Sequence, residues 1–378
     1  MRVLCVAGPT PESWYQMAPL CQAVRLAGHQ VFVAGHEDVL PHVTASGLAA
    51  VGVSTATLRD CLVDRLGTRV ELPDDQDERD IASGRVIGRF AARSLAGLTS
   101  FVERWKPDRM IGDGWALAGL LAAVRHDVPY VRFGVDLAAP VGLTVAAIAE
   151  LGPELDELGL PEMPPPWLSI SADPPALRPA DAPPSLPVRY VPAEEQVALE
   201  PWMYTRGERR RIVVALHDET VPWALFGPSR LTELTAGLGG LDAEVVVAGP
   251  AAALDRAGPP PDGARSGVAP LATLAAGCDL VVHQGYPDSV LTCLDKGVPQ
   301  VFLPAHPGFV EPGERLAELG AARVTCAAAA TPDAVTELCG KALADPALPE
   351  AAGRLRAEAR DLPLPAGLAR RITGEVTG

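Results

Sequence analysis

The feature that most constrains this chain is an alternation of short apolar runs with helix-like segments. The first series opens with the apolar run RVLCVA (2–7), continues through the turn-like GPTPES, and reaches a stretch (16–27) whose apolar residues recur at helical spacing. Gly28 is placed to end that helix, and a second apolar run, VFVAG (31–35), follows it. This strand–helix–strand order is typical of a parallel sheet with helices on both faces. We therefore expect an α/β fold.

The same alternation continues to residue 136 and restarts after the arginines at 209–211. In the second series, apolar runs predict strands over 211–219, 243–249, 279–285 and 299–304. Open α/β sheets bind their ligands beyond the carboxyl ends of the strands. Two such sheets in series therefore predict two doubly wound domains that face each other across a ligand-binding cleft.

Between the two series lies a proline-rich stretch (161–187), which we expect to form neither a regular helix nor a central strand. It is typical of a surface connection close to a domain boundary. We predict an N-terminal domain over 1–205 and a C-terminal domain over 206–360. A final helix over 361–378 is expected to pack back on the N-terminal domain.

Composition excludes several classes of protein. A chain of 378 residues that is 48% hydrophobic can bury a sizeable core, and its net charge of −15 argues against broad nucleic-acid or anionic-membrane binding. The first apolar run is too short for a signal peptide and no run is long enough to span a bilayer, which favours a cytoplasmic location. The seven cysteines lack C-x-x-C spacing and the histidines lack ligand-pair spacing, so we expect reduced thiols and no metal site.

The segment HQGYPDS (283–289) follows an apolar run and precedes a helix-like stretch. A strand, a tight loop and a helix start can bind a phosphate group, because backbone N–H groups at a helix N-terminus attract anions. Yet Asp288 stands at the mouth of this loop, and a carboxylate about 4 Å from a phosphate charge costs about 4 kcal/mol at an effective dielectric constant of 20. Either Asp288 caps the helix through backbone N–H groups, or it marks a site that no longer binds an anion.

The ordered motifs of the second series resemble those of bacterial antibiotic-tailoring GT-B glycosyltransferases. The chain has GVAPLATLAAGCDLVVHQG (267–285), LTCLDKGVPQVFLP (291–304) and ERLAELGAARV (314–324). The family carries, in the same order, a V-P-L loop, CDL-V-V-HHGGAGT, a GVPQ-x-x-x-P segment and R-L-x-x-L-G-A. Segments of the first half and the linker are also similar to the family, and these are 17–48, 106–136 and 174–192.

The resemblance implies a GT-B fold with two Rossmann-like domains. It also implies transfer of a deoxysugar, with inversion, from a dTDP- or UDP-sugar to a small aromatic acceptor. Such enzymes stabilise the diphosphate leaving group with backbone N–H groups and need no metal or cofactor. We expect no nucleic-acid or membrane partner, and a homodimer is compatible with the sequence.

The resemblance assigns donor-binding roles to residues of the second half. His283 would donate to a phosphate oxygen, Gly285 would allow close backbone approach, and Ser289 would supply a hydroxyl and a helix cap. Val268 and Pro270 lie where the family holds the nucleobase, largely by backbone groups. The alternative for His283 is a histidine that is satisfied at a strand end.

Several donor-side positions depart from the family. His217 and Asp218 replace the small Gly-Thr/Ser residues that contact the diphosphate, and His306 stands where the family has an Asp/Glu-Gln pair that grips the sugar. Both histidines are expected to face the cleft. The middle of the phosphate loop has also changed, and Asp288 belongs to that change.

Acceptor activation requires a general base. Most family members use a histidine in the first strand–helix loop, where this chain has Ser13, and serine cannot act as a base at neutral pH. The loop at 10–13 is instead similar to that of C-glycosyltransferases acting on aromatic polyketides. That subgroup carries an aspartate at the position of Asp136, which we expect to remove a phenol proton. The alternative is that Asp136 caps the following helix, and Glu12 is the fallback base.

Four residues near the predicted cleft are candidates for acceptor contact. Trp14 and Tyr15 lie in the first loop and can line a flat pocket, together with Thr10 and Trp115. For Trp115 the alternative is core packing.

Two functions follow from these features. One is an active glycosyltransferase with an unusual donor site. The other is a GT-B protein with a degenerate donor site, which catalyses another step on the aromatic scaffold or acts as an auxiliary partner.

Overall fold

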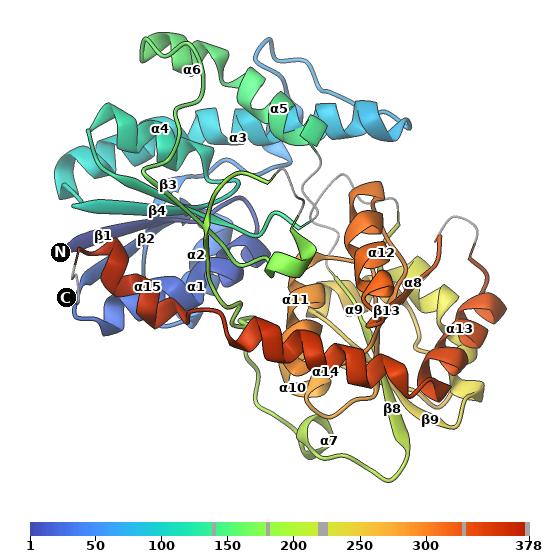
Figure 1. Cartoon of the computed structure of the whole chain (residues 1–378). Coiled ribbons are helices and arrows are strands. Elements are labelled where there is room, and N and C mark those ends of the chain that lie inside the picture. The colour runs from blue at the N-terminus through green and yellow to red at the C-terminus, as the bar shows by residue number, and fades with distance from the viewer. Residues whose placement is uncertain (138–140, 179–181, 218–225, 327–329, 375–378) are drawn as a thin grey trace. The chain divides into compact units, whose positions relative to one another are not determined.

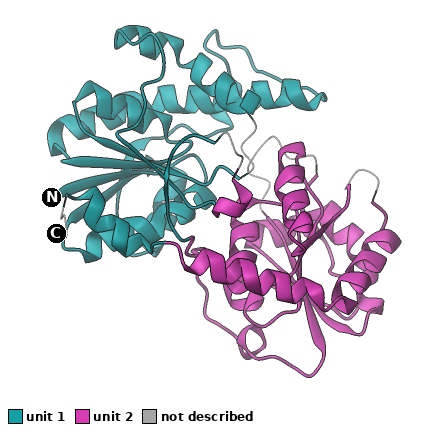
Figure 2. Ribbon diagram, viewed as in Figure 1, with its two compact units in different colours: residues 1–173, 179–189, 363–378 teal, residues 174–178, 190–362 magenta. Residues whose placement is uncertain are grey.

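A computed structural model describes the whole chain except residues 138–140, 179–181, 218–225, 327–329 and 375–378. The described chain forms two compact units (Figure 2). Unit 1 comprises 1–173, 179–189 and 363–378, and unit 2 comprises 174–178 and 190–362. The sequence placed the change of domain near residue 205, whereas the long segment of unit 2 begins at Tyr190 and ends at Leu362.

Among the described residues, unit 1 contains a seven-stranded parallel sheet in the order β3-β2-β1-β4-β5-β6-β7. In Figure 1, α3, α4 and α5 lie on one side of it and α1, α2 and α15 on the other. The strands are β1 Arg2–Val6, β2 Gln30–His36, β3 Ala49–Ser54, β4 Arg109–Asp113, β5 Tyr130–Gly134, β6 Leu168–Ser171 and β7 Leu186–Pro187. The helices are α1 Pro11–Leu26, α2 Leu40–Ala45, α3 Gln76–Trp105, α4 Leu117–Arg125, α5 Val141–Glu150, α6 Gly152–Glu157 and α15 Pro365–Ile372, with 3-10 turns η1 Glu37–Val39 and η2 Asp60–Leu62.

Unit 2 contains, in its described part, a six-stranded parallel sheet in the order β10-β9-β8-β11-β12-β13. Its strands are β8 Arg210–Ala215, β9 Ala243–Ala248, β10 Arg265–Gly267, β11 Leu280–His283, β12 Gln300–Phe302 and β13 Ala322–Val324. Its helices are α7 Pro201–Tyr204, α8 Pro228–Leu234, α9 Ala251–Ala257, α10 Leu271–Ala275, α11 Pro287–Lys296, α12 Val310–Glu318, α13 Pro332–Ala344 and α14 Ala347–Arg360, with 3-10 turns η3 Pro175–Leu177, η4 Ala236–Gly240 and η5 Pro307–Phe309. The α/β class predicted from the sequence is confirmed.

Each sheet has one switch point, where the chain leaves one side of the sheet and continues on the other. In unit 1 this point lies between β1 and β4, and in unit 2 it lies between β8 and β11. Ligands of open parallel sheets bind at such points, outside the carboxyl ends of the strands. Residues that follow these four strands are therefore candidates for ligand binding.

Helix α1 begins five residues earlier than the apolar spacing indicated. Thr10 is its N-cap and accepts a hydrogen bond from the Ser13 N–H at 3.3 Å, while Pro11 occupies the first helical position, which needs no N–H donor. The turn-like GPTPES thus includes the first helical turn. Gly28 has φ +92° just beyond the C-cap of α1, as predicted.

The expectation that the proline-rich stretch contains no central strand is wrong. Its segment Leu168–Ser171 forms β6, which pairs with both β5 and β7. The prolines stand on either side of these four residues, so each N–H needed by the sheet is present.

Helix α15 belongs to unit 1 and contacts α1. The Arg189 N–H donates to the Pro363 carbonyl oxygen at 2.8 Å, so the chain rejoins unit 1 beside the segment by which it leaves. Unit 1 thereby contains both ends of the described chain.

Candidate functional site

A polar cluster occupies the switch point of unit 2. His217 follows β8, and Asp288 and Ser289 lie in the first turn of α11, which follows β11. The His217 Nε2 atom lies 2.9 Å from Ser289 Oγ and 3.3 Å from Asp288 Oδ2. Parallel pairing of β8 with β11 places the two loops at the same edge of the sheet. Asp218 lies outside the described residues.

Asp288 does not cap α11, so the first of the two alternatives for this residue is wrong. The N-cap is Tyr286, which makes no side-chain cap hydrogen bond, and Pro287 follows it at the first helical position. Asp288 comes one residue later and turns its carboxylate to His217. Ser289 is fully buried and directs its hydroxyl to His217 as well, so it is not a cap either.

Aromatic rings enclose this cluster. The Tyr286 ring stacks on His217 with centroids 4.2 Å apart, and its edge meets Phe309 at 5.1 Å. Gly285 has φ +90°, and a Cβ there would lie 2.8 Å from the Phe309 Cβ, so glycine is required by both conformation and space. His306 is only 1% exposed, and its Nδ1 accepts the Gly308 N–H at 2.9 Å. It therefore holds the turn at η5, and its burial does not support the prediction that it faces a ligand-binding cleft.

His283 fits the alternative given from the sequence, namely a histidine at a strand end whose two ring nitrogens both have hydrogen-bond partners. It is fully buried, its Nδ1 accepts the Gly285 N–H at 3.0 Å, and its Nε2 lies 2.9 Å from Gln300 Oε1. Burial lowers its pKa to about 4, so the ring is neutral at neutral pH. Because the Gly285 N–H requires a lone pair on Nδ1, the ring proton is on Nε2 and is donated to Gln300. This geometry does not support a phosphate contact by His283.

The predicted nucleobase loop is held by a residue that the sequence analysis missed. Pro270 is buried and Val268 is half-buried just before α10. The Glu194 carboxylate accepts the N–H groups of Leu271 at 2.7 Å and Ala272 at 2.8 Å. Burial raises the pKa of Glu194, against the effect of these two hydrogen bonds. Glu194 lies in the predicted N-terminal domain but belongs to unit 2 of the structure, and from there it fixes the loop.

Asp113 organises the switch point of unit 1. It ends β4 and accepts hydrogen bonds from the Trp115 N–H at 2.7 Å and, across the sheet, from the Gly8 N–H. Burial raises its pKa to about 6, although these N–H groups oppose the shift. Ser13 donates its hydroxyl to the Thr10 carbonyl at 2.8 Å and is 5% exposed. The carboxylate therefore ties two loops together, and the hydroxyl belongs to the helix start.

Asp136 lies just beyond β5 with its side chain 42% exposed. Both carboxylate oxygens accept hydrogen bonds from the Arg132 guanidinium, Oδ2 at 2.9 Å and Oδ1 at closer range. The Asp136 N–H donates to Asp173 Oδ2 at 2.9 Å, which fixes the backbone. The side chain is thus oriented by an arginine. Whether it caps α5 falls on residues 138–140, outside the described part.

The four residues predicted to contact the acceptor differ in how far they are buried. Trp14 is fully buried, so it cannot touch an acceptor and that prediction is wrong. The Thr10 hydroxyl caps α1 and is nearly buried. Tyr15 is half-buried with its hydroxyl 3.2 Å from His42 Nδ1, and Trp115 is also half-buried. Only the last two, with the partly exposed Glu12, keep surface at this edge among the described candidates.

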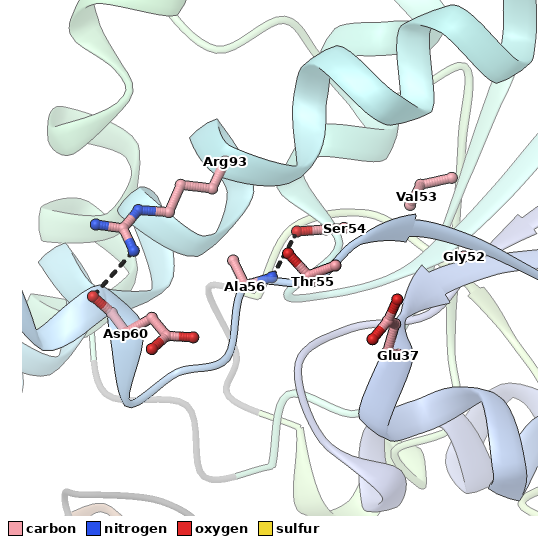
Figure 3. Close-up of a pocket in the computed structure, with 8 residues that line it drawn as sticks. All are labelled: Glu37, Gly52, Val53, Ser54, Thr55, Ala56, Asp60 and Arg93. Atoms are coloured by element: carbon pink, nitrogen blue, oxygen red, sulfur yellow. Dashed lines mark hydrogen bonds between the residues drawn. The ribbon is translucent and has the colours of Figure 1, made fainter.

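A pocket of about 650 Å³ opens at the same edge of unit 1, beyond β2 and β3 (Figure 3). Glu37, Thr55 and Asp60 contribute polar groups to it, and Arg93 of α3 closes one side. The Arg93 guanidinium is held by the Asp60 carbonyl at 3.0 Å and the Val63 carbonyl at 3.3 Å. The volume of this pocket lies within the range of small-molecule binding sites.

Comparison with known proteins identifies the family. The erythromycin biosynthesis protein CIII-like family matches the chain with its N-terminal domain over 22–217 and its C-terminal domain over 232–374. An L-demethylnoviosyl transferase from Streptomyces niveus is 32% identical over 330 residues, covering 85% of this chain and 84% of the relative. The chain belongs to this family of glycosyltransferases.

Solved structures show the same fold for the whole glycosyltransferase. SsfS6 from Streptomyces sp. SF2575, in complex with thymidine diphosphate, has a TM-score of 0.84 at 32% identity and covers 99% of both chains. The spinosyn rhamnosyltransferase SpnG, in complex with spinosyn aglycone, has a TM-score of 0.83 at 26% identity, covering 99% of this chain and 100% of the other. The GT-B architecture implied by the sequence motifs is confirmed.

In the described part of the glycosyltransferase, no group of three or more His, Cys, Asp or Glu side chains has the geometry to hold a metal ion. No helix among these residues combines the length and apolar character needed to cross a membrane.

The buried neutral His283 makes the stability of the glycosyltransferase depend on pH. Its folded-state pKa lies below the usual 6.5, so the unfolded chain binds the proton first and acid favours unfolding. Between pH 7 and pH 4.5 we expect His283 to account for a loss of about 2–3 kcal/mol in the free energy of unfolding. Denaturant titrations at both pH values measure this loss. His283→Gln should lose less stability across that interval than wild type, and an equal loss in the variant and wild type would contradict the assignment.

Proposed function

We propose that this glycosyltransferase transfers a deoxysugar from a dTDP- or UDP-sugar to an aromatic polyketide-type acceptor, with inversion and without a metal ion. The observation that carries the proposal is the anion-binding loop of the family at the switch point of unit 2. The relative SsfS6 binds thymidine diphosphate, and SpnG, a rhamnosyltransferase, binds an aglycone. A rhamnosyl group is a deoxysugar, which supports the same donor class here.

On the donor side, backbone N–H groups in the first turn of α11 stabilise the charge that develops on the leaving diphosphate. His283 acts beneath the loop, where its hydrogen bond to the Gly285 N–H fixes the backbone conformation. The loop at Val268 and Pro270, held by Glu194, receives the nucleobase. This assignment moves His283 from phosphate contact to positioning of the loop.

On the acceptor side, Asp136 removes the proton from a phenol. Phenols are far more acidic than alcohols, so a carboxylate is an adequate base, and the phenolate makes the ring carbon ortho to it nucleophilic. Arg132 orients the carboxylate through hydrogen bonds to both of its oxygens. Acid hydrolysis of the product distinguishes the two linkages, because an O-glycoside is cleaved and a C-glycoside resists.

The pocket beyond β2 and β3 takes a polar end of the acceptor. Glu37 is exposed at its wall and can accept a hydrogen bond from an acceptor hydroxyl. A hydrogen bond to a charged group contributes about 1.5–3 kcal/mol, so Glu37→Ala is expected to raise the acceptor KM by about 10-fold or more. Steady-state kinetics at saturating donor measure this change, and the Kd for dTDP should not move. An unchanged acceptor KM would place the acceptor elsewhere.

Calorimetry of the purified chain with dTDP and with UDP tests the donor assignment. Saturable binding of either nucleotide below millimolar concentration is expected, and turnover of a dTDP-sugar should be unaffected by EDTA. No binding of either nucleotide at millimolar concentration would contradict transferase activity. If the double variant Tyr286→Gly/Asp288→Gly then bound the nucleotide, these two side chains would be what closes the donor site. The protein would then have the alternative function, which is another step on the aromatic scaffold or an auxiliary role.

A further inference from the structure

Asp288 and His217 both depart from the sequence pattern of the family, and they lie at the same site. Asp288 brings a negative charge to the first turn of α11, where the backbone N–H groups attract an anion. His217, two residues beyond the end of the neighbouring strand β8, places Nε2 3.3 Å from that carboxylate. Among the described residues, Asp288 forms no ion pair with a lysine or an arginine. His217 is therefore the side chain that can donate a hydrogen bond to this carboxylate.

The proton on the imidazole follows from the geometry. Nε2 faces both Asp288 Oδ2 at 3.3 Å and Ser289 Oγ at 2.9 Å. A lone pair on Nε2 would point at the negatively charged carboxylate, which is repulsive, so the N–H form is favoured. In that form Nε2–H is shared between the carboxylate and the hydroxyl oxygen. The ring is held in this position by the stacked Tyr286 at 4.2 Å.

We propose that His217 and Asp288 form a compensating pair, in which the Nε2–H group of His217 donates to the Asp288 carboxylate and orients it so that a nucleoside diphosphate binds at α11. The proposal rests on the proposed function, because it assigns the two residues to the donor site of that reaction. His217 acts on the diphosphate through Asp288 and is a positioning residue. Asp288 by itself would repel the ligand.

This pair predicts that the effect of removing His217 on the affinity for dTDP depends on whether Asp288 is present. His217→Ala leaves the carboxylate unpaired, so the affinity for dTDP should fall by about 10-fold or more. Asp288→Ala should keep or improve the affinity, because no charge needs compensation. The double variant His217→Ala/Asp288→Ala should return to within about 3-fold of wild type. The loss caused by removing His217 therefore requires Asp288.

Titration calorimetry with dTDP on the full chain measures all four Kd values, with thermal melts to verify folding. His217→Gln keeps an N–H donor at this position and serves if His217→Ala does not fold; it should bind more tightly than alanine at this position. Asp255→Ala removes an exposed carboxylate on α9 and should leave Kd unchanged.

The outcomes separate the pair from the proposed function. If wild type binds dTDP and the double variant is as weak as His217→Ala, His217 contacts the phosphate directly and the compensating pair is wrong. If His217→Ala binds as well as wild type, the pair is equally wrong, although the donor site stands. If wild type binds neither dTDP nor UDP, both the proposed function and the compensating pair are wrong.

Discussion

Replacement of Asp136 by asparagine is expected to lower kcat by about 100-fold or more, with little change in the Kd for dTDP. A positioned general base contributes about 10²–10⁴-fold, and asparagine keeps the shape of the side chain without its basicity. Arg132 can still donate to the amide oxygen, so the side chain at position 136 should keep its orientation. Initial rates with saturating dTDP-sugar and a phenolic acceptor measure the loss.

Two further carboxylates test whether the loss is specific. Glu12→Gln should retain most of the activity, and the opposite result would make Glu12 the base. Asp113→Asn is expected to act differently, because Asp113 accepts N–H groups from two loops and an asparagine nitrogen cannot. It should lower the melting temperature as well as the rate. Full activity in Asp136→Asn would exclude Asp136 as the proton acceptor.

The fold was largely predictable because its signal is local and repeated. Fully buried strands such as β1 and β8 read as short apolar runs, and the helices between them follow helical spacing. β6 was missed because four residues between prolines carry too little pattern to predict a strand. α3 was missed because its polar residues include several that are buried or paired, Asp80 and Arg89 among them.

The site was predictable in position but not in orientation. Motif order placed His217 and the HQGYPDS segment together, and the structure brings them to one switch point. No spacing rule states that the N-cap of α11 is Tyr286, which frees Asp288 to pair with a residue 71 positions earlier in the chain. Glu194 was missed for the same reason, since a lone glutamate in a linker carries no sequence signal for hydrogen bonds to α10. Long-range pairing decides these roles.

Close packing of α3 on α5 depends on two glycines of α3. Gly84 and Gly88 are four residues apart on α3, so they share one face of that helix. A Cβ at Gly84 would lie 2.2 Å from the Leu143 carbonyl oxygen, and a Cβ at Gly88 would lie 2.6 Å from the Ala147 carbonyl oxygen. These neighbours are backbone atoms of α5, so they cannot move without moving the helix. The two glycines therefore set the distance between the helices.

Gly84→Ala is accordingly expected to destabilise the protein by about 1–3 kcal/mol, even though alanine gains about 1 kcal/mol in helix propensity over glycine. Gly353 is the matched control, because it lies in α14 with no atom within 4 Å of an added Cβ. Gly353→Ala should stabilise the protein by about 0.5–1 kcal/mol. Denaturant titrations of both variants measure these opposite signs. Equal stabilisation by the two substitutions would mean that α3 and α5 do not approach this closely.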